Sequence, residues 1–322
     1  MTAPQSQAVS ARANRWHQST LSNLLDGCSW QYFLTYVIGL DTGKKPHAAI
    51  GTAYHSAVEL HEKNRMDNKE TTREEMEEYA IKQFTKTIKQ DDPEFEELSA
   101  NVKAAIGNWY EYHRPQILEW TPVAIEPEFT LPLVDAHKPI GGYIDAIYRD
   151  RDNNTFIVDH KTAKNFDRWR DADGHRTQAA MYATALVLSP DFPEITELPE
   201  MVYMVSRTST SNRKDFEKGR TLRVQPTIED VRLLGDRIRA AEVIVATESY
   251  ERKPEWPLCS PKWCAFYQGC QVDKTLAGSP TFVKLSVRQQ NIKSHLNKKP
   301  SLTKGYRQHS NIVTQDNNTG EV

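Results

Sequence analysis

The spacing of apolar residues changes once along the chain, near Pro122, and this change limits the folds that the chain can adopt. Before Pro122, apolar residues recur at the 3.6-residue period of a helix, which predicts helices at about 19–36, from about 52, and at about 97–118. After it, short apolar or alternating runs predict strands at 123–133, 140–149, 155–162, 200–206 and 221–225, and helices at about 175–188 and 227–247. Helices followed by a small sheet that one helix crosses favour an α/β or α+β core with few strands.

The segment 62–97 is dense in charge. Within it, Thr72 and Glu75 have the spacing of a capping box, in which each side chain bonds the backbone N–H of the other residue. We predict a solvated helical insertion at about 62–118, ahead of a core at about 120–250.

Hydropathy argues against a membrane or secreted protein. The mean hydropathy is −0.67, no stretch approaches the roughly 18 consecutive apolar residues of a spanning helix, and the first twenty residues lack the apolar run of a secretory signal. We therefore expect a soluble, cytoplasmic protein that contacts no membrane.

Charge is distributed unevenly along the chain. Residues 274–315 carry eight Lys or Arg and no acid, and because the whole chain has a net charge of −2 with Asp316 and Glu321 following, residues 1–273 sum to −8. We predict that 278–322 is a basic, flexible tail that attracts polyanions. The alternative is a solvated tail without a specific role.

The most informative stretch is an acidic hairpin around Asp145, Asp159 and Lys161. Residues two apart in a strand point the same way, so Asp159 and Lys161 share a face. A three-residue loop (152–154) would pair Asp145 with Lys161 and bring the three groups together. A two-residue loop would pair Asp145 with His160 and turn it away, unless a bulge resets the ladder.

Two carboxylates beside a lysine on an apolar sheet are costly unless something compensates their charge. A divalent cation such as Mg²⁺, which prefers carboxylate oxygens and water, compensates them, binds phosphate and lowers the pKa of a bound water. The plainer interpretation is an ordinary hairpin with a surface ion pair.

Two flanking segments bear on this choice. His55 lies one helical turn from Gly51 and Glu59, on one helix face, and an imidazole can be a further metal ligand. Gln178 and Tyr182 lie one turn apart on an alanine-rich helix. Taken singly, His55 fits an ordinary helix histidine and Tyr182 fits a core residue.

Taken in order, four motifs resemble the RecB-like branch of the PD-(D/E)XK nuclease superfamily: Gly51-x3-His55, Gly142-x-Ile-Asp145, Val158-Asp159-His160-Lys161-Thr162 and Gln178-x3-Tyr182. One departure is an aspartate at 159, where glutamate is commoner. The resemblance implies a restriction-endonuclease-like core, a small mixed sheet flanked by helices, in a single nuclease domain over 1–277.

The resemblance also implies roles for these residues. His55, Asp145 and Asp159 would bind Mg²⁺ or Mn²⁺, with the backbone carbonyl of His160 as a further ligand. Lys161 would be the catalytic lysine, and Gln178 and Tyr182 would steady the DNA or the metal-bound water.

The four cysteines extend the resemblance. Cys28 lies in the first helix, and Cys259, Cys264 and Cys270 cluster in the unit 254–273. Four thiolates are the complement of a 4Fe-4S cluster, and the pattern is similar to the iron-sulfur staple of AddB-type nuclease domains and CRISPR-associated RecB-like exonucleases. The first spacing within the trio, Cys-x4-Cys, departs from the usual Cys-x2-Cys. A zinc site and buried thiols remain the alternatives.

These observations predict a Mg²⁺- or Mn²⁺-dependent DNA exonuclease that hydrolyses single strands or DNA ends, in recombination, repair, or CRISPR or phage DNA processing. The alternative is a non-catalytic DNA-binding scaffold of a larger complex. Because the chain has no phosphate-binding loop of the Gly-x4-Gly-Lys-Ser/Thr type, coupling to unwinding needs a helicase partner, and a recombinase or CRISPR adaptation partner fits equally. The candidate DNA-binding residues, with a solvated basic surface as the alternative, are Lys164, Arg168, Arg170 and Arg176.

Overall fold

A computed structural model describes residues 14–40, 46–133, 136–211, 213, 215–261 and 263–272. The chain divides into two compact units, Met1–Pro257 and Leu258–Val322, which are described separately. The predicted basic tail, 278–322, lies outside the described residues. None of the helices in the described ranges combines the length and the apolar character that a membrane crossing requires.

The first unit begins with three short helical segments, α2 (Gln18–Leu25), α3 (Ser29–Tyr32) and the π-helical η1 (Phe33–Val37). The prediction of a single helix at 19–36 is therefore wrong, because the helix is interrupted at Gly27. The Gly27 N–H donates to Ser22 O at 2.9 Å in the turn that ends α2. A Cβ at Gly27 would lie 2.8 Å from the carbonyl oxygen of Asn23, so this tight turn requires glycine.

Four helices then form one layer: α4 (Pro46–Met66), α5 (Arg73–Phe84), α6 (Phe95–Tyr112) and α7 (Arg114–Ile117). The capping box that opens α5 is confirmed, since Glu75 N–H donates to Thr72 Oγ1 at 3.2 Å and Thr72 N–H to Glu75 Oε2 at 2.8 Å. Met76, Ala80 and Phe84 of α5 are fully buried, in the same core cluster as residues of α4 and α6.

The main sheet has the order β1-β4-β5-β6-β7, in which only β5 and β6 run parallel. β2 and β3 pair in a second, two-stranded sheet. The runs predicted at 123–133 and 140–149 are each split into two strands, at Glu126–Pro127 and at Ile144–Asp145. The strands are β1 (Thr121–Ile125), β2 (Glu128–Leu131), β3 (Ile140–Tyr143), β4 (Ala146–Arg149), β5 (Thr155–Ala163), β6 (Met201–Arg207) and β7 (Gly219–Val224).

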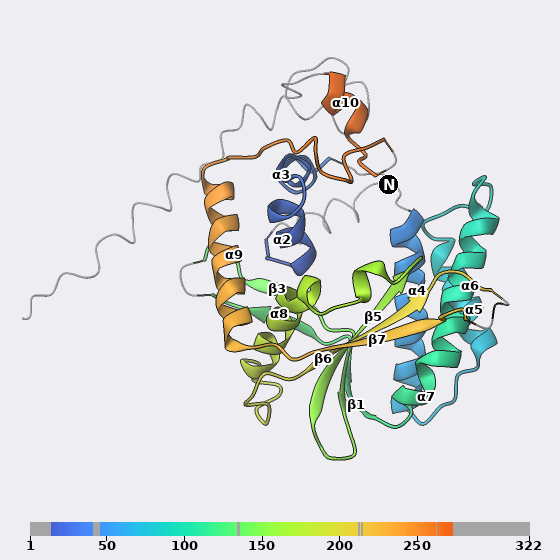
Figure 1. Cartoon of the computed structure of the whole chain (residues 1–322). Helices are drawn as coiled ribbons and strands as arrows, with labels where there is room; N and C mark the ends of the chain where they lie inside the picture. The colour runs from blue at the N-terminus through green and yellow to red at the C-terminus, as the bar shows by residue number, and fades with distance from the viewer. Residues whose placement is uncertain are drawn as a thin grey trace, which may run out of the picture. The chain divides into compact units, whose positions relative to one another are not determined.

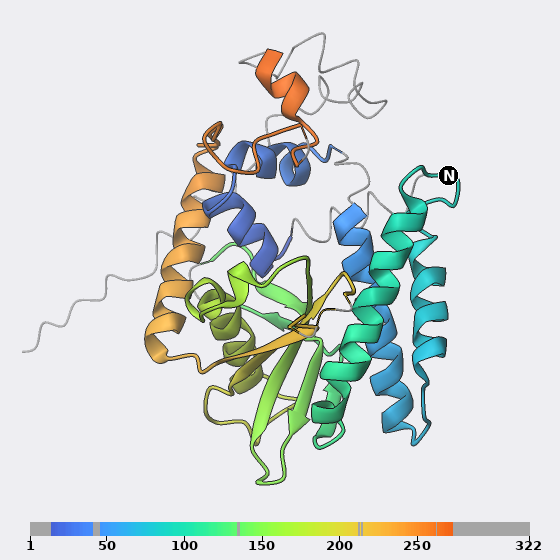
Figure 2. The same cartoon turned by 45° about the vertical axis from the view of Figure 1, so that its right-hand side comes forward.

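The connection from β5 to β6 contains α8 (Arg176–Val187), and β7 is followed by α9 (Ile228–Ala246). Figures 1 and 2 show α4, α5 and α6 on one side of the sheet and α8 with α9 on the other. Each side has its own buried cluster, and a third cluster packs α2 and α9 together around Trp16. The expected α/β architecture, a small mixed sheet flanked by helices, is confirmed, and this sheet has five strands.

The register of the acidic hairpin differs from both predicted alternatives. Ile147 pairs with Ile157 and Arg149 with Thr155, so a five-residue loop, 150–154, joins β4 and β5. Asp150 stabilises this loop because its carboxylate accepts the backbone N–H groups of Asp152 and Asn154 at 2.9 and 2.8 Å. The ladder extrapolates to Asp145 opposite Asp159, and the two carboxylates are therefore brought to one end of the hairpin.

Candidate active site

Strand β5 carries two of the predicted catalytic residues, Asp159 and Lys161. Their side chains form an ion pair, and Asp159 is only 1 % exposed whereas Lys161 is half-buried. Together with Ile157, they lie at every second position of the strand and so point to one face of the sheet. Ile157 belongs to the buried cluster on the α8 side of the sheet. The predicted shared face of Asp159 and Lys161 is confirmed.

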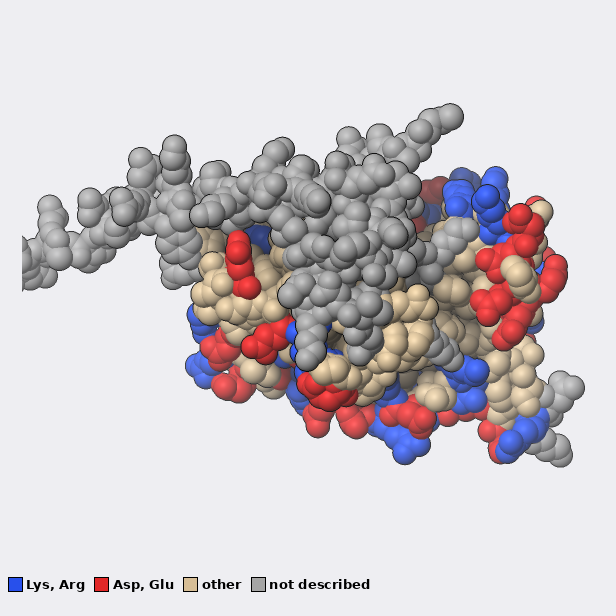
Figure 3. Space-filling view, turned by 90° about the horizontal axis from the view of Figure 1, so that it is seen from above, with Lys and Arg blue, Asp and Glu red and all other residues tan. Residues whose placement is uncertain are grey.

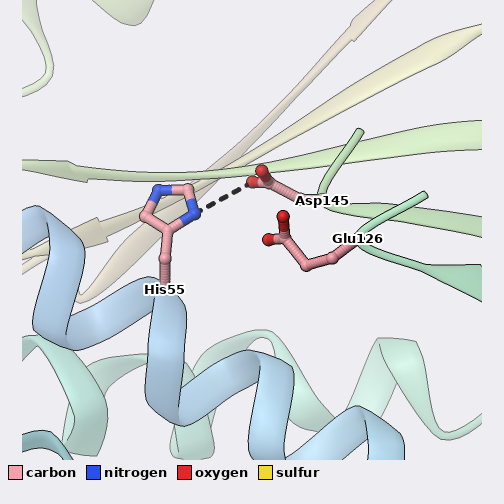
Figure 4. Close-up of side chains that lie close together, drawn as sticks. All are labelled: His55, Glu126 and Asp145. Carbon is pink, nitrogen blue, oxygen red and sulfur yellow. Dashed lines mark ion pairs between the residues drawn. The ribbon is translucent and has the colours of Figure 1, made fainter. Parts of the chain in front are cut away.

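Asp145 precedes β4, and two groups hold its Oδ2 oxygen. The main-chain N–H of His160 donates to it at 2.7 Å, and Nδ1 of His55, from the middle of α4, lies 3.2 Å away. Figure 4 shows His55 reaching from the helix toward Asp145. The helical layer and the sheet thus each supply one partner to this carboxylate.

Glu126 joins this group, and the sequence analysis missed it. Ligand atoms of His55, Glu126 and Asp145 all lie within 4.8 Å of one another, and in the described part of the chain they are the one such group of three (Figure 4). The backbone N–H of Glu126 donates to Asp145 O at 3.0 Å, and its φ of 54° is a left-handed conformation that costs a non-glycine residue energy. The one sequence signal was an acid beside Pro127, inside the run predicted at 123–133, and Glu128 shares that signal.

Helix α8 supplies Gln178 and Tyr182 on the other side of Asp159. Gln178 Nε2 donates to Asp159 Oδ1 at 2.8 Å, and both residues of this bond are buried. The Tyr182 ring meets Phe129 edge to face at 5.6 Å between centroids. The helix whose alanines pack on the sheet therefore orients the carboxylate of Asp159.

The charges of this cluster shift one another's pKa values. Burial raises the pKa of Asp159 to about 6, and the nearby charge of Asp145 adds to that rise. Burial also opposes ionisation of Asp145, but His55 and Lys161 outweigh it and hold the pKa of Asp145 below its usual range. Burial, followed by the charge of Asp145, raises the pKa of Glu126 to about 7. One strongly acidic carboxyl beside two weakly acidic ones is the pattern expected when several acids converge on a site for one cation.

Only the backbone of His160 faces this cluster. Its ring is 2 % exposed and makes edge contacts with Tyr54 and Trp109 on the side of α4 and α6. Burial lowers the pKa of the His160 imidazole to about 3, so the ring is neutral. Its predicted contribution to metal binding, the backbone carbonyl, stays a prediction.

The four basic residues predicted to bind DNA follow β5. Lys164, Arg168 and Arg170 are exposed, and Arg176 is half-buried. Arg170 pairs with Asp167 at 2.8 Å, and Arg176 with Asp230 at 3.2 Å. The role of all four residues in DNA binding stays a prediction. The charges of Arg170 and Arg176 are already paired with carboxylates.

All four cysteines are partly buried. In the first unit, Cys28 precedes α3, and its Sγ lies 3.8 Å from Glu251 O. In the second unit, Cys264 and Cys270 flank the start of helix α10 (Tyr267–Val272), and the Cys270 N–H donates to Phe266 O at 2.9 Å. The predicted iron-sulfur cluster is not tested by these contacts.

Known proteins were compared at the levels of sequence and fold. A family model described as the PD-(D/E)XK nuclease superfamily matches residues 15–271. The chain belongs to this superfamily. No curated protein matches. Among solved structures similar to this nuclease, a protein from Eubacterium rectale described as "Putative exonuclease" has a TM-score of 0.50 at 10% identity, over 80% of this chain and 92% of that one. A second structure, SSO0001, has a TM-score of 0.33 at 14% identity, over 60% of this chain and 92% of that one.

Membership of the superfamily implies a metal-dependent nuclease, and the residues present fit a divalent cation. Asp145 and Glu126 offer hard carboxylate oxygens, and His55 offers a nitrogen, within the spread that one ion bridges. Asp159, across the ladder from Asp145, adds a buried carboxylate. These residues therefore form the candidate metal centre of the nuclease, between α4, the start of β4 and β5.

Proposed function

We propose that this nuclease is a DNA exonuclease that hydrolyses phosphodiester bonds in single strands or at DNA ends. The observation that carries the proposal is the convergence of Asp145, Asp159 and Lys161 at one end of the β4–β5 hairpin, with Gln178 bonded to Asp159. A scaffold that only binds DNA has no physical need for clustered buried carboxylates, which cost free energy unless they serve a cation.

In the proposed reaction a water oxygen bonds to phosphorus, one ester P–O bond breaks, and the leaving oxygen takes up a proton. A divalent ion, Mg²⁺ or Mn²⁺, would bind the scissile phosphate and lower the pKa of the attacking water. His55, Glu126, Asp145 and Asp159 would hold that ion.

Lys161 supplies a positive charge beside the reacting phosphate. Burial favours its neutral form, but Asp159 and Asp145 outweigh this and raise the pKa of Lys161, so its ammonium group stays protonated at neutral pH. A fixed ammonium group stabilises the negative charge that develops on the phosphoryl oxygens. Gln178, held against Asp159 Oδ1, orients that carboxylate.

Digestion of end-labelled single-stranded DNA with Mg²⁺ or Mn²⁺ tests the proposal. Lys161→Ala and Asp145→Ala should each lose at least about a hundredfold in rate, whereas Lys103→Ala, at an exposed position on α6, should cleave as the wild type does. Covalently closed circular single strands should resist cleavage if the enzyme requires an end. Equal activity in wild type, Lys161→Ala and Asp145→Ala, or no activity in any of them, contradicts the catalytic assignment.

We further propose that Cys28, Cys259, Cys264 and Cys270 bind a 4Fe-4S cluster with a structural role. The support is the sequence: four thiols, the number such a cluster takes, and no further cysteine in the chain. Anaerobically purified protein should be brown, absorb broadly near about 400 nm and contain about four iron atoms per chain. Colourless protein that contains zinc would reject the cluster.

The pathway proposed for this activity is recombination, repair, or CRISPR or phage DNA processing. Its support is the similarity to RecB-like nucleases with cysteine staples, and a helicase, recombinase or CRISPR adaptation partner would supply unwinding or substrate. A non-catalytic DNA-binding scaffold is the competing function, and the digestion experiment decides between them.

A further inference from the structure

Arg207 ends β6 next to the catalytic strand. In the parallel β5–β6 ladder, Lys161 pairs with Val205 and Ala163 with Arg207. Paired residues of neighbouring strands share a face, so Arg207 lies on the face that carries Lys161, one strand over and two residues, about 7 Å, further along. A DNA strand with one phosphate at Lys161 can bring a neighbouring phosphate to this position.

Two aromatic rings and two backbone bonds hold Arg207 in place. Its guanidinium carbon lies 4.6 Å from the centroid of Phe166 and 4.8 Å from that of Phe216. Its backbone N–H donates to Lys218 O at 3.0 Å, and its carbonyl oxygen accepts from Asn108 Nδ2 at 2.8 Å. Rings over the guanidinium leave the in-plane N–H donors at its edge for an anion, and this fork geometry matches phosphate oxygens.

The charge of Arg207 has no carboxylate partner among the described residues, and its buried Nε makes no hydrogen bond there. Its neighbour Arg220, whose guanidinium carbon also lies over the Phe166 ring, 5.1 Å from the centroid, differs: Nε and Nη2 of Arg220 bond Glu217 at 2.8 and 2.9 Å. Where the described residues are visible on the face in Figure 3, acidic and basic side chains intermingle, so charge alone does not distinguish one cation there from another. A preorganised, half-buried arginine without a counter-ion is a more specific signal.

We propose that Arg207 binds a backbone phosphate of the substrate strand next to the scissile one, and thereby positions that strand over Lys161. The inference rests on the proposed nuclease function. It assigns Arg207 as a positioning residue, and it makes Phe166 and Phe216 the side walls of an anion site.

The test measures binding of a fluorescein-labelled single-stranded oligonucleotide by anisotropy, with Mg²⁺, in a Lys161→Ala background that prevents turnover. Arg207→Met removes the charge but keeps an apolar stem between the rings. Its affinity should fall about tenfold, and the slope of log K against log salt should become shallower by about 0.7, the value for one phosphate on a single strand. Arg207→Lys should keep the slope but bind more weakly than the Lys161→Ala parent, because an ammonium lacks the fork.

Arg232→Met is the matched control, at an exposed arginine of α9 that pairs with Glu229 at 3.0 Å. It should leave affinity and slope unchanged. If Arg207→Met fails to fold, Phe216→Ala, which frees one face of the guanidinium, should weaken binding without changing the slope, and unchanged affinity overturns the inference.

The outcomes separate the two proposals. Wild-type protein that neither binds nor cleaves DNA contradicts the proposed function, and this inference with it. Wild-type protein that cleaves DNA, together with an Arg207→Met variant that binds like Arg232→Met, overturns only the role of Arg207.

Discussion

Glu126 and its neighbour Glu128 are the same residue type, but their side chains have different surroundings. Glu126 lies within ligand distance of His55 and Asp145, whereas Glu128 points to solvent and pairs with Arg15 at 2.6 Å. An expensive left-handed backbone at Glu126 persists only where its surroundings impose it. That combination indicates a residue kept in place for binding.

Glu126→Gln should therefore weaken Mn²⁺ binding by about 10- to 100-fold, because it removes one negative charge at the ion while keeping the shape of the side chain. Calorimetric titration with Mn²⁺ measures the change. Glu128→Gln is the control and should bind Mn²⁺ as the wild type does. Equal affinities of the two variants would remove Glu126 from the metal site.

His113 links stability to pH. Its side chain is completely buried against β6, with Nε2 3.1 Å from Val205 O. Burial lowers the pKa of His113 to about 4 from the ordinary 6.5. As the pH falls below 6.5, the unfolded chain takes up a proton that the folded chain does not, so the folded state loses stability down to about pH 4.

His113→Gln should remove this dependence while keeping a donor for the carbonyl. Between pH 7 and pH 5, the free energy of unfolding of the wild type should fall by about 2 kcal/mol more than that of the variant. Urea unfolding at both pH values measures the difference, and His47→Gln, at an exposed position, should behave as the wild type. An unchanged pH dependence in His113→Gln contradicts the assignment.

At the scale of elements, α4 docks on the sheet through a buried carboxylate. Glu62 is 1 % exposed and accepts from Tyr148 on β4 at 2.7 Å, from Arg65 at 3.0 Å, and bonds His61 at 2.7 Å. This network lies two turns along α4 from His55, so it fixes the helix that presents the imidazole to Asp145.

Tyr148→Phe should lower the free energy of unfolding by about 1.5 to 3 kcal/mol, because it leaves a buried charged group short of one hydrogen bond. Chemical denaturation of the metal-free protein measures the loss. Tyr143→Phe on β3, where the side chain is half exposed, should change it by less than about 0.5 kcal/mol. Equal small effects would mean that Glu62 is satisfied without Tyr148.

The sequence predicted the elements well where periodicity and end signals agreed. α8 and α9 begin and end within a residue or so of the prediction, and the box at Thr72 opens α5. Register was not predictable, because it depends on Asp150 closing a five-residue loop, a local bond that competes with shorter turns. Glu126 and Arg207 were missed because their partners lie far away in the sequence.

At the scale of the whole chain, charge divides between an acidic part, 1–273, and the basic segment 278–322, whose proposed role is to attract polyanions. Residues 1–273 sum to −8, so binding of a polyanion must rely on local cations such as Arg207 or on the tail.

Deletion of 278–322, which removes seven Lys or Arg, should weaken DNA binding and make it less sensitive to salt, while the turnover number at saturating DNA stays close to that of the wild type. Deletion of 308–322, which contains no Lys or Arg, is the control and should change neither quantity. Anisotropy titrations across a salt series measure both, and identical salt slopes in the two deletions would leave the tail without a role in binding.

The bond from the His160 N–H to Asp145 has a consequence for how such a site varies during evolution. A backbone amide is the same whichever side chain follows it, so any residue except proline at position 160 offers Asp145 the same donor. The side chain at that position is then free to adapt to Tyr54 and Trp109 in the helical layer. Two lineages of this enzyme can thus diverge in their helices, and in the middle residue of the Asp-x-Lys motif, while the carboxylate keeps its partner.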